Sequence, residues 1–395
     1  MRTEKNEVME RNETVQMMRN GTMEREMSEN MADYDGRPCV AAMDLGTNSN
    51  RLLIADTAGN AVYRDVKHVA LGEGLAESGK FCWRATERAI CSFMDFAEML
   101  KLYNVRRYRA IATAACRMST NTAAFRAEVK RTSGVDIEVI SEYEEARLTL
   151  LGARLNAQAG KKYLLVYDLG GGSTEVTLAT NAATPEILAT VSVPLGARNA
   201  TEMFGLANYN EAGAKALEEA VLKYLEPFFA QTAGIDYHGQ AALVATSSTP
   251  LRLVSLIKKM PKYDKFASDG VTVATADLDR VIGEILPLSY AKRAESVYIG
   301  PQRAKIFVAA LVIFRTIFRA LGEAELTASL KSAQEAIVAE LAAEERGGLG
   351  EPAELSANEP AEDTAGVLLP AAEECAENRV RTGVETKTEA GLWQN

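Results

Sequence analysis

Two stretches of this chain follow the same pattern, and the repetition limits the folds that the chain can adopt. Each stretch has an apolar strand, then Asp-Leu-Gly, then small polar residues, then a second apolar strand. The first is CVAAMDLGTNSNRLLIAD and the second is YLLVYDLGGGSTEVTLA. Their aspartates, Asp44 and Asp168, lie 124 residues apart. Such self-similarity predicts a duplicated domain, with two similar halves that face each other across a cleft.

Strand-like and helix-like segments alternate along the chain, which indicates an α/β fold. Short apolar runs predict the strands, and apolar residues at helical spacing predict the helices. The predicted strands are residues 39–43, 51–55, 108–113, 137–140, 164–167, 176–179 and 241–245. The predicted helices are residues 90–102, 142–155, 212–225, 303–321 and 326–343. We therefore expect a first domain over residues 38–160 and a second domain, closed by the last two helices, over residues 161–343.

The two ends of the chain differ in composition from its middle. Residues 1–37 and 344–395 are polar and lack an apolar period, so we predict a disordered N-terminal extension and a disordered acidic tail. These ends hold 10 of the 44 basic and 21 of the 54 acidic side chains, which leaves 34 basic and 33 acidic ones in residues 38–343. The net charge of −10 thus belongs to the ends and does not exclude an anionic substrate.

Cysteine usage and hydropathy favour a cytoplasmic protein. The five cysteines are odd in number and form no CxxC pair, which argues against a disulfide framework or a zinc site. No apolar run near the N-terminus resembles a signal peptide. The most apolar stretch, residues 306–314, is shorter than the roughly 20 residues that a membrane span needs, so we interpret it as part of a buried helix.

The turn after each Asp-Leu-Gly is suited to binding phosphate. Glycine lets backbone N–H groups approach an anion closely, and successive N–H groups form an anion-binding nest. One such turn is equally typical of an ordinary hairpin, but two matched copies favour a phosphate site. The residues predicted to bind substrate are Gly46, Thr47, Asn48 and Ser49 in the first loop and Gly170, Gly171, Gly172 and Ser173 in the second.

Two carboxylates flank the second loop and fit a divalent cation. Mg²⁺ is usually held by one or two carboxylates together with water and substrate oxygens, and phosphate transfer needs its positive charge. Asp168 and Glu175 are therefore the predicted ligands of Mg²⁺, or of Mn²⁺. The alternative is that Glu175 is an ordinary exposed residue of a strand.

A helix predicted to start near Ser141 carries two adjacent glutamates. The sequence Ser-Glu-Tyr-Glu matches a capping box, in which Ser141 is the N-cap and Glu144 reaches back to its backbone N–H. The cap explains Glu144 but not Glu145, so Glu145 is the candidate general base. Arg117 follows another predicted strand, where it either clamps a phosphate with paired hydrogen bonds or lies in solvent.

These segments resemble the exopolyphosphatase and guanosine pentaphosphate phosphohydrolase family, within the superfamily of actin, sugar kinases and heat-shock ATPases. The resemblance covers residues 38–255 well and thins after residue 298. Its most specific feature is the combination of ISEYEEAR with DLGGGSTE, because general kinases of the superfamily lack the former. It implies an α/β fold of two duplicated ribonuclease H-like (actin-like ATPase) domains.

The resemblance also implies a role for each candidate residue. Glu145 matches the family's catalytic base, which activates water, and Arg117 matches its substrate arginine. Asp168 and Glu175 match its metal-site carboxylates, and the two glycine loops match its phosphate loops. The implied substrate is inorganic polyphosphate or guanosine pentaphosphate, with Mg²⁺ (or Mn²⁺) as cofactor. We expect no nucleic-acid or membrane partner, and a homodimer stays open.

Some features depart from the family's pattern. Ser248 stands where the family often has glycine. The chain after residue 325 is too short for the further helical domain of the family's long members, so it resembles the short form, and action on long chains stays open. A basic stretch, residues 252–265 with Lys258, Lys259, Lys262 and Lys265, either extends the phosphate site or is a solvated surface loop.

Two other classes of function compete with hydrolysis. A non-catalytic sensor that binds polyphosphate or the alarmone would need no base, so Glu145 argues against it. A nucleotide-dependent kinase would need an adenosine pocket, and the EEAR segment argues against it. The sequence does not choose between polyphosphate and guanosine pentaphosphate.

Overall fold

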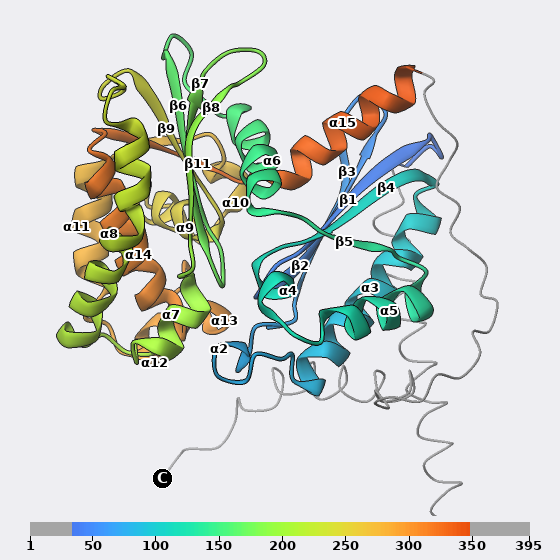
Figure 1. Ribbon diagram of the computed structural model, residues 1–395, viewed down its shortest axis with the longest axis horizontal. Helices are drawn as coiled ribbons and strands as arrows, with labels where there is room; N and C mark the ends of the chain where they lie inside the picture. Colours follow the sequence, from blue (N-terminus) through green and yellow to red (C-terminus); the bar gives the residue numbers. More distant parts are fainter. Residues whose placement is uncertain (1–33, 348–395) are drawn as a thin grey trace, which may run out of the picture.

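The computed structural model describes residues 34–347, which form two α/β halves (Figure 1). The first half contains a five-stranded sheet of order β3-β2-β1-β4-β5. Its central strand β1 pairs antiparallel with β2 and parallel with β4. The strands are β1 Cys39–Leu45, β2 Ser49–Asp56, β3 Ala61–His68, β4 Val105–Ala112 and β5 Ile137–Val139.

The second half repeats this topology. Its sheet has the order β10-β11-β9-β6-β7-β8, and without the edge strand β10 it matches the first sheet strand for strand. Here β6 pairs antiparallel with β7 and parallel with β9. The duplicated α/β fold predicted from the repeat is therefore confirmed. The strands are β6 Tyr163–Leu169, β7 Thr174–Thr180, β8 Ile187–Val193, β9 Ala241–Thr246, β10 Thr272–Ala274 and β11 Glu325–Ser329.

Helices cover both sheets. Those of the first half are α2 Leu75–Ser78, α3 Trp83–Leu102, α4 Ala114–Met118, α5 Thr122–Ser133 and α6 Glu142–Arg154. Those that follow are α7 Ala197–Met203, α8 Glu211–Thr232, α9 Ser248–Ile257, α10 Lys265–Ser268, α11 Thr275–Ile285, α12 Tyr290–Glu295, α13 Pro301–Ala304, α14 Phe307–Leu321 and α15 Ala333–Gly347. The apolar stretch 306–314 lies in the buried helix α14, as predicted. Among the described helices, none has the length and hydropathy of a membrane span.

The central strands β1, β6 and β9 are buried on both faces, which explains their nearly continuous apolar sequences. In β1 and β6 the odd-numbered residues face the outer core of their own half, under α3 and α5 or under α8 and α14. The even-numbered residues of the same strands face inward, toward the other half. This alternation follows from the two-residue period of a strand.

The two inner faces are covered by helices that cross from one half to the other. Helix α6 follows β5 of the first sheet and packs Leu150 and Ala153 on the second. Helix α15 follows β11 of the second sheet and packs Ile337 and Val338 on the first. Figure 1 shows both helices in the region between the sheets. The predicted domains, 38–160 and 161–343, therefore exchange their last helices.

One predicted helix is wrong in its first part. Residues 326–343 were expected to form a single helix, but residues 325–329 form the strand β11. The tertiary structure decides this segment, because β11 lies between β9 and β10 and Leu326 and Ala328 are fully buried there. The helix α15 begins only at Ala333.

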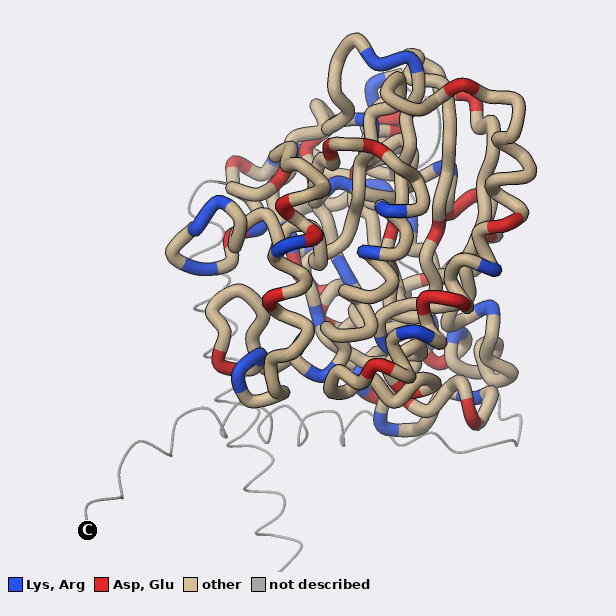
Figure 2. Tube along the Cα trace, turned by 90° about the vertical axis from the view of Figure 1, so that its left-hand side faces the viewer, with Lys and Arg blue, Asp and Glu red and all other residues tan. Residues whose placement is uncertain are grey.

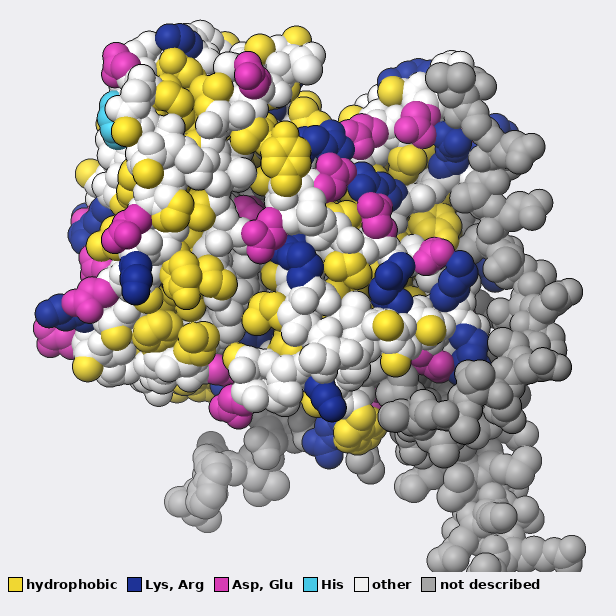
Figure 3. All heavy atoms as spheres, in the orientation of Figure 1, with side chains coloured by type: hydrophobic (Ala, Val, Ile, Leu, Met, Phe, Trp, Pro, Cys, Tyr) yellow, Lys and Arg dark blue, Asp and Glu magenta, His cyan; other side chains and the backbone are white. Residues whose placement is uncertain are grey.

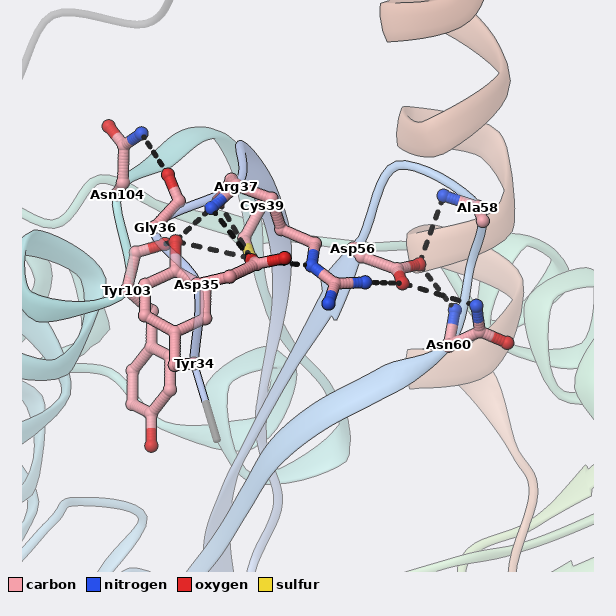
Figure 4. A network of polar contacts seen from close by, with 10 residues as sticks. All are labelled: Tyr34, Asp35, Gly36, Arg37, Cys39, Asp56, Ala58, Asn60, Tyr103 and Asn104. Carbon is pink, nitrogen blue, oxygen red and sulfur yellow. Dashed lines mark hydrogen bonds and ion pairs between the residues drawn. The ribbon is translucent and has the colours of Figure 1, made fainter. Parts of the chain in front are cut away.

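The last residues of the predicted N-terminal extension are ordered. The Tyr34 ring packs at a tilt against the Tyr103 ring, with 5.1 Å between ring centroids, and its hydroxyl donates to the Tyr103 carbonyl at 2.7 Å. Arg37 donates to the Asp56 carboxylate at 3.3 Å (Figure 4). The extension predicted over 1–37 is thus wrong for residues 34–37. Residues 1–33 and 348–395 lie outside the described residues.

The crossing of α6 with the start of α15 leaves no room for a side chain at Gly152. A Cβ atom there would lie 1.9 Å from the Ser332 carbonyl oxygen. We expect Gly152→Ala to lower the free energy of unfolding by about 1–3 kcal/mol, measured by urea denaturation, because the helices must separate. Gly283→Ala is the control, since its Cβ would meet nothing within 4 Å. It should leave stability unchanged or raise it, and equal stability of both variants would contradict the crossing.

Candidate active site

The repeated aspartates project toward each other's half of the molecule. Asp44 shares the inner face of β1 with Val40 and Ala42, and Asp168 shares the inner face of β6 with Leu164 and Val166. Each aspartate therefore points into the space between the sheets. Both carboxylates belong to one cleft of about 590 Å³.

The residue opposite each aspartate lies on the same face. Strand pairing sets Arg51 against Asp44 and Glu175 against Asp168, and directly opposed residues of an antiparallel pair project to the same side. Arg51 and Glu175 are 124 residues apart, as the aspartates are. Equivalent positions of the two halves thus hold the positively charged Arg51 and the acidic Glu175.

In the second phosphate loop the backbone carbonyls are hydrogen-bonded within residues 34–347, but three successive backbone N–H groups are not. The carbonyls of Gly170 and Gly171 accept hydrogen bonds at 2.9 and 2.8 Å from the N–H groups that begin α7. The Gly172 carbonyl accepts from the Asn199 side chain at 2.8 Å. Among the described residues, no acceptor faces the N–H groups of Gly171, Gly172 and Ser173. Successive free N–H groups form a nest for an anion.

The first loop is anchored in the same way. Its Thr47 carbonyl accepts from the Gly72 N–H at 2.8 Å, and its Asn48 carbonyl accepts from the Ala70 N–H at 2.9 Å. Each loop is also closed by one equivalent bond, from Gly46 N–H to Ser49 in the first and from Gly170 N–H to Ser173 in the second. The repeat therefore extends to the hydrogen bonds that hold both loops in place.

The two loops touch each other. A Cβ atom on Gly172 would lie 2.6 Å from the Thr47 hydroxyl oxygen, and one on Gly171 would lie 3.2 Å from the Cβ of Asn48. Only glycine lets the second loop lie this close to the side chains of Thr47 and Asn48. The phosphate nests of the two halves therefore form one continuous lining.

Helix α6 brings Glu145 into this cleft. The Ser141 hydroxyl accepts from the Glu144 N–H at 3.2 Å, so Ser141 is the N-cap, as predicted. The reciprocal half of the predicted capping box is wrong. The Glu144 carboxylate instead accepts from Arg147 at 2.7 Å and from Arg109 at 3.0 Å, because two guanidinium groups bind a carboxylate better than one backbone N–H does.

Glu145 is buried beside Arg117. The Arg117 guanidinium donates to the Glu145 carboxylate at 2.8 Å and to the Ile140 carbonyl at 3.1 Å. Burial raises the pKa of Glu145 to about 7, and Arg117 partly opposes this rise. A carboxylate with this pKa can take up a proton near neutral pH, which suits a general base.

Three further carboxyl groups enclose the site. Burial raises the pKa of Asp44 and of Asp168, and the Arg51 charge partly opposes both shifts. Burial, together with the charges of Glu145 and Asp168, raises the pKa of Glu175 well above its usual range. The cleft therefore holds more negative charge than it neutralises by itself.

The donor set at Asp168 and Glu175 fits a divalent cation in part. The two carboxylates lie on one face, burial raises the pKa of both, and the charges of Glu145 and Asp168 add to the rise at Glu175, so a cation would stabilise their ionised forms. Within residues 34–347, no three His, Cys, Asp or Glu side chains cluster as a complete metal site. Substrate oxygens and water would have to complete the coordination, as is usual for Mg²⁺.

The structure brings the sequence-predicted site residues together. All predicted phosphate-loop residues line the cleft with Glu145, Asp168 and Glu175, and Arg117 reaches it through Glu145. Their roles stay predictions. The cleft residues that the sequence analysis did not assign are Asp44, Arg51, Thr113, Leu169, Ser247 and Arg303.

Some of these residues carried a signal in the sequence. Asp44 and Arg51 are the repeat counterparts of Asp168 and Glu175, so the repeat alone could have found them. Arg303 comes from α13, far along the chain, and nothing local marks it. Burial lowers the pKa of Arg303 to about 10, and its Nε atom has no hydrogen-bond partner among the described residues. This guanidinium is available to an anion.

Ser247, the residue before Ser248, has an unusual backbone conformation. Ser247 has φ 92° and ψ 179°, a region that favours glycine, and it lines the cleft before α9. Ser248, the residue that differs from the family's glycine, is the first residue of α9. The exposed residues Lys258, Lys259 and Lys262 follow α9 and do not line the cleft, so the polyphosphate track stays a prediction.

Charge over the rest of the surface is mixed. Basic and acidic positions alternate along the described chain, and the face in Figure 3 carries no continuous patch of one sign (Figures 2 and 3). The arginines that line the cleft are Arg51 and Arg303, and they lie there among the carboxyl groups of Asp44, Glu145, Asp168 and Glu175.

The sequence and the fold are similar to those of known proteins. Residues 53–345 match the Ppx/GppA phosphatase family. The chain belongs to this family. One relative is exopolyphosphatase 2 of Mycobacterium tuberculosis (strain CDC 1551 / Oshkosh), which is 31% identical over 302 residues that cover 72% of this chain and 91% of that protein.

Solved structures agree with the fold. An exopolyphosphatase-like protein has a TM-score of 0.71 and 27% identity, covering 77% of this chain and 99% of its own. An exopolyphosphatase from Cytophaga hutchinsonii has a TM-score of 0.71 at 21% identity, covering 77% and 98%, which supports the fold alone. By family, this Ppx/GppA protein is a hydrolase of the exopolyphosphatase type.

Adjacent glutamates allow a matched test of the base. Glu145→Gln keeps the size of the side chain but removes its basicity, so we expect kcat to fall about 10²–10⁴-fold while substrate binding persists. Glu144→Gln, one residue away, should change stability by about 1 kcal/mol or less and leave kcat nearly intact, because its pairs with Arg109 and Arg147 are partly exposed. Steady-state phosphate release measures kcat for both variants. Equal kcat values would show that Glu145 is not the general base.

Proposed function

We propose that this protein hydrolyses the terminal phosphate of inorganic polyphosphate by in-line attack of water, with Glu145 as general base. The observation that carries the proposal is the position of a buried glutamate of raised pKa in a cleft lined by two facing anion nests. A cleft built only to bind an anion would have no use for a buried base. The non-catalytic sensor therefore remains the weaker candidate.

The chain's own groups supply positioning and charge stabilisation, which is most of what phosphoryl transfer requires. The two nests hold the oxygens of the terminal phosphate. Glu145 takes a proton from water as the new P–O bond forms, and the bond from phosphorus to the bridging oxygen breaks. The shortened chain leaves with the electrons of that bond. Arg117 donates to the Glu145 carboxylate at 2.8 Å and so holds it in place.

Asp168 and Glu175 would hold Mg²⁺ or Mn²⁺, which supplies positive charge against the developing negative charge of the leaving phosphate. Their position as opposed residues of one strand pair supports this assignment. Arg51 and Arg303, which also line the cleft, would then meet the next phosphates of the substrate.

Two substrates are compatible with this reaction. The name of the Mycobacterium tuberculosis relative favours inorganic polyphosphate, and the family description also includes GppA phosphatases, for which guanosine pentaphosphate is the corresponding substrate. Both have a terminal phosphoanhydride, so the cleft chemistry is the same. We take polyphosphate as the leading substrate and place the reaction in the cytoplasm.

Phosphate release from tripolyphosphate, long polyphosphate and guanosine pentaphosphate, each with and without Mg²⁺, tests this proposal. We expect release from polyphosphate that chelation abolishes. Glu175→Ala should raise the Mg²⁺ concentration for half-maximal rate, because one carboxylate ligand is lost. Binding of polyphosphate without release of phosphate would favour the sensor, and an unchanged metal dependence in Glu175→Ala would remove that residue from the metal site.

A further inference from the structure

Arg198 links the two halves at the phosphate loops. It is the second residue of α7, the helix whose first N–H groups hold the second loop. Its guanidinium crosses to the first loop and donates to the Asn48 side-chain oxygen from Nε at 3.1 Å and from a terminal nitrogen at 2.5 Å. Its carboxylate neighbour, Glu202, lies farther away, at 4.0 Å. Asn48 is therefore the principal partner of Arg198.

This contact fixes which way the Asn48 amide points. A guanidinium can only donate hydrogen bonds, so the carbonyl oxygen of the amide must face Arg198. The amide nitrogen then faces the Ser49 hydroxyl at 3.3 Å, and that hydroxyl meets His68 Nδ1 at 2.9 Å. The second N–H of the amide has no acceptor among residues 34–347. Asn48 thus offers a donor at the cleft.

The orientation matters because a phosphate oxygen only accepts hydrogen bonds. If the amide rotated by half a turn, its carbonyl oxygen would face the anion and repel it. Nothing else in the described contacts of Asn48 fixes the amide as firmly, because the Ser49 hydroxyl can both donate and accept. Arg198 itself is absent from the residues that line the cleft.

We propose that Arg198 is a positioning residue that acts through Asn48: when the halves are closed, it turns the N–H groups of the Asn48 amide toward the substrate phosphate. The inference rests on the proposed function and deepens it. It makes the donor set of the first loop depend on a residue of the second half. The Asn48 amide is then oriented for phosphate only when the two halves are in contact.

A double-mutant cycle tests the inference, with tripolyphosphate as the probe and binding measured by calorimetry. All variants carry Glu145→Gln, so that turnover does not interfere. Arg198→Met keeps the aliphatic stem but removes the donors, and should weaken binding about 10- to 100-fold. Added to Asn48→Ala, the same change should cost nothing further, because Arg198 acts through the amide. Arg198→Lys, which retains a donor, should recover part of the affinity.

Glu202→Gln is the matched control, because it removes the other neighbour of Arg198 but leaves the Asn48 contact. It should bind tripolyphosphate like the reference chain. Melting temperatures of all variants identify any loss of folding, and Arg198→Lys keeps the test open if Arg198→Met does not fold. The inference alone would be overturned if Arg198→Met lost the same affinity in the Asn48→Ala background as with Asn48 present. It would also be overturned if Arg198→Met lost no affinity. A reference chain that does not bind tripolyphosphate would overturn the proposed function as well.

Discussion

The direct contact between the two glycine loops is the constraint on which the rest of the structure depends. Gly172 lies against Thr47 so closely that no side chain fits between them. The contact brings the two halves together, and Glu145 of α6 is buried in the cleft that both loops line. The raised pKa of Glu145 follows from that burial. The same contact allows Arg198 to reach Asn48 across the boundary.

The two halves have matching strands and loops, and differences between equivalent residues give each half its own chemical groups. Both loops retain the same closing hydrogen bond and the same anchored carbonyls. Between residues 44–51 and their counterparts 168–175, the charge differs at one pair of positions, where the first half has Arg51 and the second has Glu175. One side of the cleft can therefore attract anionic substrate while the other suits a cation. A symmetric pair of loops would bind phosphate but would lack this division.

The sequence predicted those features that depend on local pattern. The repeat indicated two equivalent halves, the Asp-Leu-Gly turns marked both loops, and Ser141 marked the start of α6. Features that depend on tertiary packing were missed. Strand β11 forms because β9 and β10 flank it, α15 packs on the opposite half, and Tyr34 is fixed by Tyr103, to which no sequence pattern connects it. Arg303 likewise reaches the cleft only through the fold.

The most direct test of the central claim, that both loops bind one phosphate together, is kcat/KM for polyphosphate in Gly172→Ala with and without Thr47→Ala. The added methyl group should push the loops apart, and a displacement of about 1 Å can lower kcat/KM about 100-fold. Thr47→Ala removes the hydroxyl oxygen that lies 2.6 Å from the new methyl group, so the double variant should regain most of the lost kcat/KM. Full activity of Gly172→Ala, or a double variant no better than Gly172→Ala alone, would contradict the account.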